Sequence, residues 1–124
     1  MQLTRAEEQV MQYLWQLGEG AVQEIRECFA DSVPSRTTVS TIIRILETKG
    51  FVDHKAGGRG FIYYPLVAKK EYSRQQLFGM MKDYFNNSFS SMASFFAQET
   101  NLSAQEMEKI LEETKRELEE NKSQ

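Results

Sequence analysis

The chain is poor in the residues from which enzymes and metal centres are built. It has one cysteine, Cys28, and one histidine, His54, so an internal disulfide and a multi-cysteine zinc site are excluded. It shows no Ser/His/Asp or Cys/His spacing, and its glycine-rich segment 57–60 does not open a helix as a phosphate-binding loop would. We therefore predict that the protein is not an enzyme and carries neither a cofactor nor a metal ion.

Long apolar runs and prolines are scarce as well. No apolar run approaches the length that spans a bilayer, and no signal peptide is visible, which favours a cytoplasmic protein without membrane insertion. The two prolines are Pro34 and Pro65, so no proline interrupts the segment from Lys69 to the end of the chain. Hydrophobic residues make up 40% of the sequence, which is enough for a core and too many for a disordered chain.

The net charge of −3 argues against a nucleic-acid partner, but the charges are unevenly placed. Residues 35–59 contain five basic and two acidic side chains, a local charge of +3. Residues 99–124 contain four basic and eight acidic side chains, a local charge of −4. The centre of the chain is therefore the segment suited to DNA phosphates, and the acidic surplus lies at the C-terminal end.

Residues 35–49 are predicted to form a recognition helix. Ser35 can cap its first turn, and Gly50 can take the left-handed conformation that ends it. One side is apolar, whereas the other carries short hydroxyls and a guanidinium, which can enter a DNA groove and bond phosphates and base edges. The apolar stripe is Val39, Ile42, Ile43 and Leu46, and the opposite face is Thr37, Thr41, Arg44 and Thr48.

A predicted β-hairpin, the wing at residues 51–66, follows this helix. Strands 51–56 and 61–66 are joined by the glycine-rich turn, which is the order of elements in a winged helix-turn-helix. A small α+β domain with a threonine-rich surface is the alternative. His54 is expected to be a surface residue without a special role, and phosphate contact is its less favoured alternative. The residues predicted to contact DNA are Arg36, Thr37, Ser40, Thr41, Arg44, Lys55 and Arg59.

The N-terminal segment is predicted to supply two helices that support the recognition helix. The first begins at the capping box of Thr4 and Glu7, with an apolar stripe of Ala6, Val10, Leu14 and Leu17. Residues 21–22 could add a third strand to the wing, and residues 23–30 are predicted to form the second helix. Trp15 and Phe29 are expected to be core residues rather than platforms for bases, and Cys28 a small, partly buried side chain.

Residues 68–124 are predicted to form a helical dimerisation tail on a DNA-binding head at residues 1–67. One helix is expected from Lys69 to about Gln98 and another after the capping box of Ser103 and Glu106. The apolar side chains are too many for one helix to hide, which favours an interface between two chains. A tail folded onto its own head is the alternative. The predicted dimer interface is Leu77, Met81, Tyr84, Phe85, Phe89, Met92, Phe95, Phe96, Met107, Ile110, Leu111 and Leu118.

The predicted fold class is therefore mainly α (α+β), a winged helix-turn-helix head with a C-terminal helical dimerisation tail. The function that fits best is a DNA-binding transcriptional repressor, a homodimer on a palindromic operator in double-stranded DNA. A winged-helix module that binds protein is the alternative, and the overall acidity supports it.

The order and spacing of these segments resemble the BlaI/MecI/CopY repressors. The similarity extends from Leu3 to the last helix, and it implies the winged-helix fold, a dimer formed by the C-terminal helices and repression by blocking a promoter. The residues that carry it are Thr38-Val39-x-Thr41, Leu46, Lys49-Gly50-Phe51-Val52, Thr4-x-x-Glu7, Trp15 and Tyr63-Tyr64.

The resemblance also raises two inducing signals. Copper-responsive members carry paired cysteines near the C-terminus, and this chain has no cysteine after Cys28, which rules out that route. Penicillinase repressors are inactivated by cleavage of the tail at an Asn-Phe pair, and a membrane-bound sensor protease triggers this cleavage. That pair would fall on Phe95-Phe96, where the Asn is absent. The resemblance therefore suggests a sensor protease as a partner, but the missing Asn does not support cleavage at this position.

Overall fold

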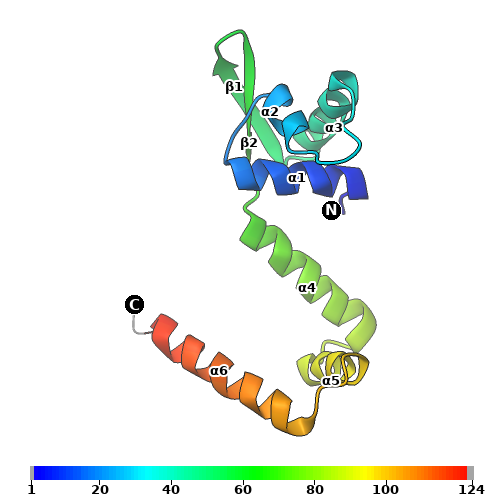
Figure 1. Cartoon of the computed structure of the whole chain (residues 1–124), viewed down its shortest axis with the longest axis vertical. Coiled ribbons are helices and arrows are strands. Elements are labelled where there is room, and N and C mark those ends of the chain that lie inside the picture. Colours follow the sequence, from blue (N-terminus) through cyan, green and yellow to red (C-terminus); the bar gives the residue numbers. More distant parts are fainter. Residues whose placement is uncertain (1, 123–124) are drawn as a thin grey trace. The chain divides into compact units, whose positions relative to one another are not determined.

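The computed structural model describes residues 2–122, which are mainly helical with one two-stranded antiparallel sheet (Figure 1). The chain forms two compact units, Met1–Gln75 and Gln76–Gln124, called here the head unit and the tail unit. The predicted fold class is confirmed, and the functional boundary at residue 67 stays a prediction. The elements are α1 (Arg5–Leu17), α2 (Val22–Glu27), α3 (Arg36–Thr48), β1 (Val52–Gly57), β2 (Gly60–Pro65), α4 (Lys69–Phe85), α5 (Phe89–Glu99) and α6 (Ala104–Lys122).

Helix α1 begins at the predicted capping box. The Glu7 amide donates to Thr4 Oγ1 at 3.2 Å, and the Thr4 amide donates to Glu7 Oε1 at 3.0 Å. The predicted apolar stripe is only partly right, because Ala6 is exposed and Leu17 is 39% exposed. The face that packs inward is Glu7, Val10, Met11 and Leu14. This face packs against α3, and Met11, which lies beside the predicted stripe, is fully buried there.

The segment between α1 and α2 does not form the third strand that residues 21–22 could have added to the wing. Only Gly20 pairs with the wing, exchanging two backbone hydrogen bonds with Tyr63 at 2.9 and 2.8 Å. Ala21 instead precedes α2, and its amide donates to Glu24 Oε1 at 3.0 Å. A capping bond of this kind satisfies an amide at the start of a helix, which favours helix over strand here. Helix α2 ends at Glu27, earlier than predicted.

Helix α3, the predicted recognition helix, has both predicted ends. Ser35 Oγ accepts from the Thr38 amide at 3.1 Å, and Gly50 has a φ of 84°. Val39, Ile43 and Leu46 are fully buried, and Ile42 is half-buried beside them. These residues hold α3 against α1 and α2, so its hydroxyl-rich side faces outward.

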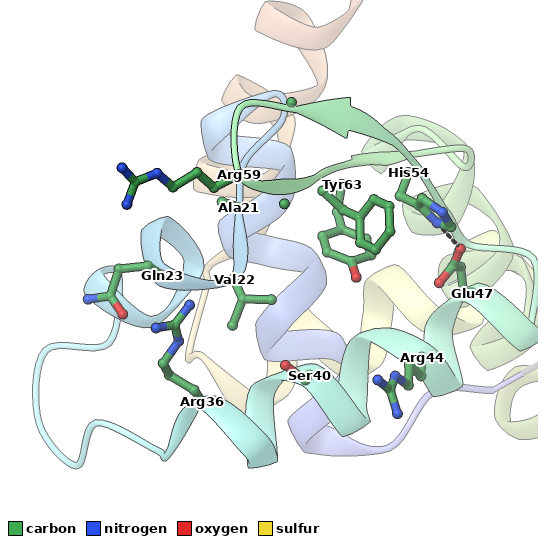
Figure 2. A pocket seen from close by; sticks show the side chains of 13 residues that line it. Ala21, Val22, Gln23, Arg36, Ser40, Arg44, Glu47, His54, Arg59 and Tyr63 are labelled. Atoms are coloured by element: carbon green, nitrogen blue, oxygen red, sulfur yellow. Dashed lines mark hydrogen bonds and ion pairs between the residues drawn. The ribbon is translucent and has the colours of Figure 1, made fainter.

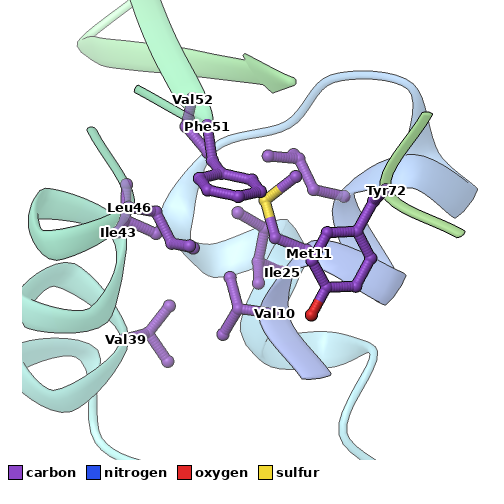
Figure 3. Packing of buried hydrophobic residues seen from close by; sticks show 10 residues of the cluster. Val10, Met11, Ile25, Val39, Ile43, Leu46, Phe51, Val52 and Tyr72 are labelled. Carbon is purple, nitrogen blue, oxygen red and sulfur yellow. The ribbon is translucent and has the colours of Figure 1, made fainter. Parts of the chain in front are cut away.

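One hydrophobic core holds the head unit together (Figure 3). Burial of such side chains contributes about 1.5–3 kcal/mol each. Trp15 packs against this core as predicted, and its indole Nε1–H donates to the Val67 carbonyl at 2.8 Å. Phe29 also packs there. The core residues are Val10, Met11, Leu14, Ile25, Val39, Ile43, Leu46, Phe51, Val52 and Tyr72.

Tyr72 is a core residue that comes from the first turns of α4. Its ring centroid lies 5.6 Å from that of Trp15 and 5.9 Å from that of Phe51. Its hydroxyl donates to Glu8 Oε2 at 2.7 Å. Burial raises the pKa of Tyr72 to about 12, with the Glu8 carboxylate adding to the shift, so the phenol stays neutral near pH 7. The head unit therefore includes the start of α4.

The tail unit is not one continuous helix up to Gln98, as the sequence pattern predicted. The helix breaks at Asn86 and Asn87, whose φ angles of 54° and 62° are left-handed. Asn tolerates this conformation better than most residues. Ser88 then caps α5 by accepting from the Ser91 amide at 3.1 Å. Among residues 2–122, no helix is long and apolar enough to cross a membrane.

The capping box predicted for the last helix is confirmed. The Glu106 amide donates to Ser103 Oγ at 3.1 Å, and the Ser103 amide donates to Glu106 Oε1 at 3.2 Å. Asn101, with a φ of 56°, supplies the bend between α5 and α6. Helix α6 thus begins where local sequence dictates.

Candidate nucleic-acid interface

A groove of about 670 Å³ lies between the start of α2, the outward side of α3 and the wing (Figure 2). The wing is the β1–β2 hairpin, with Val52 paired to Pro65 at its base and Gly57 to Gly60 at its tip. The groove is built entirely within the head unit. It is lined by Ala21, Val22, Gln23, Arg36, Ser40, Arg44, Glu47, His54, Gly57, Arg59, Gly60, Phe61 and Tyr63.

Three arginines that the sequence predicts to contact DNA line this groove. Arg36 and Arg44 extend from α3, and Arg59 extends from the turn of the wing (Figure 2). All three are exposed. Ser40 lies between the two α3 arginines and also lines the groove. Guanidinium groups can bond phosphate oxygens or guanine edges, so the arrangement suits a nucleic acid.

The other predicted contacts lie outside the groove lining. Thr37 and Thr41 are exposed on α3, and Thr41 Oγ1 donates to the Thr37 carbonyl at 2.9 Å. That bond uses the hydroxyl proton within the helix and leaves the oxygen able to accept. Lys55 Nζ donates to Glu19 Oε1 at 3.0 Å. Both partners are about half exposed, so this ion pair is weak and can open for a phosphate.

Several groove residues were not predicted from the sequence. Gln23 comes from the first turn of α2, and Tyr63 and Phe61 come from β2. The alternation of a strand could have indicated the last two, because His54 pairs with Tyr63 across the hairpin and Ala56 with Phe61. Nothing in the local pattern places Gln23 near α3, because that proximity depends on how α2 packs.

His54 and Glu47 join the recognition helix to the wing at one edge of the groove. His54 Nδ1 lies 2.5 Å from Glu47 Oε2, as the dashed line in Figure 2 marks. The imidazole centroid lies 4.6 Å from that of the Phe61 ring and 5.8 Å from that of the Tyr63 ring. His54 is therefore held in place by defined contacts on β2 and α3, which the sequence did not predict.

Three helices followed by a β-hairpin, with arginines around the groove between α3 and the hairpin, define a winged helix-turn-helix protein. Proteins of this class place the second helix of the motif in a DNA groove. The chain belongs to the penicillinase repressor family, whose sequence profile matches residues 3–116. The resemblance seen in the sequence is thereby confirmed.

The relatives agree with this assignment over most of their length. The penicillinase repressor of Bacillus licheniformis is 29% identical over 110 residues, covering 88% of this chain and 86% of the relative. The methicillin resistance regulatory protein MecI of Staphylococcus aureus strain N315 is 26% identical, covering 88% and 89%. The solution structure of the DNA-binding domain of the repressor BlaI covers 57% of this chain and 88% of that domain, with a TM-score of 0.50 and 29% identity.

Proposed function

We propose that this protein is a transcriptional repressor that binds a palindromic operator as a homodimer. The observation that carries the proposal is the groove in which α3 and the wing present Arg36, Arg44 and Arg59 together. Helix α3 enters the major groove, and the wing lies on the DNA backbone or in the adjacent minor groove. The known DNA-binding domain of BlaI, which is similar to the head unit in sequence and fold, supports this role.

The dimer is supported by an apolar cavity of about 550 Å³ within the tail unit. Tyr84, Phe89, Phe95 and Phe96 are all more than half exposed, although they are large and apolar. Exposed apolar surface of this extent marks an interface in soluble proteins. The cavity is lined by Leu77, Met80, Phe85, Phe89, Met92, Ala93, Phe95, Phe96, Glu99, Leu102, Met107, Ile110, Leu111 and Thr114.

Most residues predicted for the dimer interface belong to this cavity. Met81, Tyr84 and Leu118 lie outside its lining, and Tyr84 is the most exposed of them at 77%. A second copy of the tail would cover both sets of side chains, and stable dimers bury on the order of 2,000 Å² or more. Two heads held in this way would read two half-sites spaced by whole helical turns.

The experiment that tests the function is selection of DNA from a random pool, followed by binding measurements across salt concentrations. A repressor of this kind enriches an inverted repeat, and its log affinity falls steeply with log salt because phosphate contacts release counterions. Failure to enrich any sequence, with no salt-dependent binding to duplex DNA, would favour the protein-interaction module.

A further inference from the structure

We propose that Glu47, Asp53 and His54 form a site for one divalent transition-metal ion of the zinc class, against the prediction from the sequence that the protein carries no metal ion. The three residues come from the end of α3 and the start of β1, where the recognition helix meets the wing. One potential ligand atom from each residue lies within 4.8 Å of the other two. Glu47 precedes Asp53 by six positions and His54 by seven, and the turn through Gly50 brings Glu47 close to the other two.

The three potential ligand atoms already lie near one another. His54 Nδ1 lies 2.5 Å from Glu47 Oε2 and 3.9 Å from Asp53 Oδ1. Tetrahedral zinc with nitrogen and oxygen ligands holds its ligand atoms about 3.3 Å apart, which lies between these two distances. A small rotation of the two carboxylates would therefore admit the ion, which would replace the proton of the His54–Glu47 hydrogen bond and release it to solvent. One imidazole with two carboxylates is a donor set that suits zinc and its neighbours.

The ligands are also oriented in advance. Asp53 Oδ1 accepts from the His54 backbone amide at 2.8 Å, which holds that carboxylate beside the imidazole. The Phe61 and Tyr63 rings pack on the imidazole, so its plane is set by the hairpin. Ligands held by such outer contacts lose less freedom when a metal binds. The same imidazole nitrogen, His54 Nδ1, faces the carboxylates of both Glu47 and Asp53.

The site borders the groove, and this gives the ion a consequence that rests on the proposed function. Glu47 and His54 line the groove, so a fourth coordination position would open toward it. Two carboxylates at this edge repel DNA phosphates, and a divalent ion would cancel that repulsion. It would also link the wing to the recognition helix. Metal binding should therefore strengthen DNA binding, and by thermodynamic reciprocity DNA should strengthen metal binding.

The first test uses the full-length, tag-free protein without DNA, in the Cys28→Ser background so that the thiol cannot compete. Zn²⁺ is titrated against a chromophoric chelator while the ring-proton NMR signals of the one histidine are followed. We expect one bound ion per chain and a shift of the His54 signals. His54→Gln and Glu47→Gln should each weaken binding by more than about tenfold, as even the loss of an outer-shell partner does. The matched control, Asp31→Asn, removes another exposed carboxylate of the head and should bind as before.

Thermal unfolding of each variant shows whether it remains folded; His54 is exposed and Glu47 is half-buried, so neither substitution removes a core side chain. Binding that persists in both folded variants, or His54 signals that stay in place at saturating Zn²⁺, would overturn the site. The second test compares operator binding with Zn²⁺ and with chelator. Equal affinities would overturn the coupling to DNA, whereas the proposed function would stand. Metal binding without any DNA binding would overturn the proposed function and leave the site.

Discussion

Lys49 Nζ lies 2.6 Å from Glu7 Oε1, which ties the end of the recognition helix to the start of α1. The Glu7 side chain is only 7% exposed and also closes the α1 capping box, so one carboxylate serves two elements. The hydrogen bond from Lys49 holds the pKa of Glu7 below its ordinary value of 4.5, against the opposing effect of burial. The ion pair therefore positions α3 as well as stabilising the head.

Glu7→Gln should reduce the free energy of unfolding by about 1–3 kcal/mol near pH 7, because it leaves the Lys49 ammonium without its charged partner. A carboxyl whose pKa is lowered by folding stabilises the fold above its unfolded pKa, and this contribution is lost as pH falls through the folded pKa. The wild type should thus lose stability below pH 4.5, and the variant should lose less.

Urea unfolding at several pH values measures this pH dependence of the free energy of unfolding. Glu27→Gln, on the exposed side of α2, is the control, and parallel pH profiles for wild type and Glu7→Gln would contradict the prediction.

Arg44→Ala should cost about 1–3 kcal/mol of binding to the selected operator and less on random DNA. Arg44 is the long basic side chain near the middle of the outward face of α3, and Arg is the usual partner of guanine O6 and N7. Fluorescence anisotropy with both DNAs measures the difference. Arg74→Ala removes an exposed arginine outside the groove and should bind both DNAs as the wild type does. Equal weakening on both DNAs would make Arg44 a phosphate contact.

Replacing Lys55 and Arg59 by Gln should flatten the plot of log affinity against log salt by a slope of about 2. The single variants separate the two charges. Arg59 already borders the groove, whereas Lys55 must first leave Glu19. Glu19→Gln should therefore strengthen DNA binding, because it releases Lys55. An unchanged slope in the double variant would remove the wing from the interface.

Phe89→Asp combined with Ile110→Asp should convert the full-length protein to a monomer. Both residues line the tail cavity, and an unpaired charge in an apolar interface costs several kcal/mol. Sedimentation equilibrium measures the change. Gln98→Asp with Gln105→Asp adds the same charges at exposed positions of α5 and α6 outside the cavity lining, and should remain a dimer. A wild type that sediments as a monomer while it binds an inverted repeat tightly would refute the dimer.

A fragment ending at Gln75 should be more stable than one ending at Val67 by about 3–5 kcal/mol, the usual cost of removing a buried aromatic side chain. Only the longer fragment keeps Tyr72, which packs on Trp15 and Phe51 and donates to Glu8. Urea unfolding of the two fragments measures the difference. Tyr72→Ala in the longer fragment should reproduce most of the loss. Equal midpoints for the two fragments would show that the head is complete at residue 67.

The sequence by itself determined the features that depend on neighbouring residues. The caps at Thr4, Ser35 and Ser103, the left-handed Gly50 and the hairpin all followed from it, because each is a contact between residues a few positions apart. The outward position of Arg44 also followed, since helical spacing separates the outward face of α3 from the buried one. The break at Asn86 and Asn87 is also a local feature, but the apolar periodicity continues across it and predicted one unbroken helix.

Only the tertiary structure decided which distant side chains meet. Lys49 and Glu7 are 42 positions apart, Lys55 and Glu19 are 36 apart, and Tyr72 and Glu8 are 64 apart. No local sequence pattern predicts these pairs, because the distance between their side chains is set by how the core packs. The same holds for the approach of Glu47 to His54, which depends on how the wing folds back against α3. Local chemistry predicts elements and faces, and burial of the shared core selects the contacts between them.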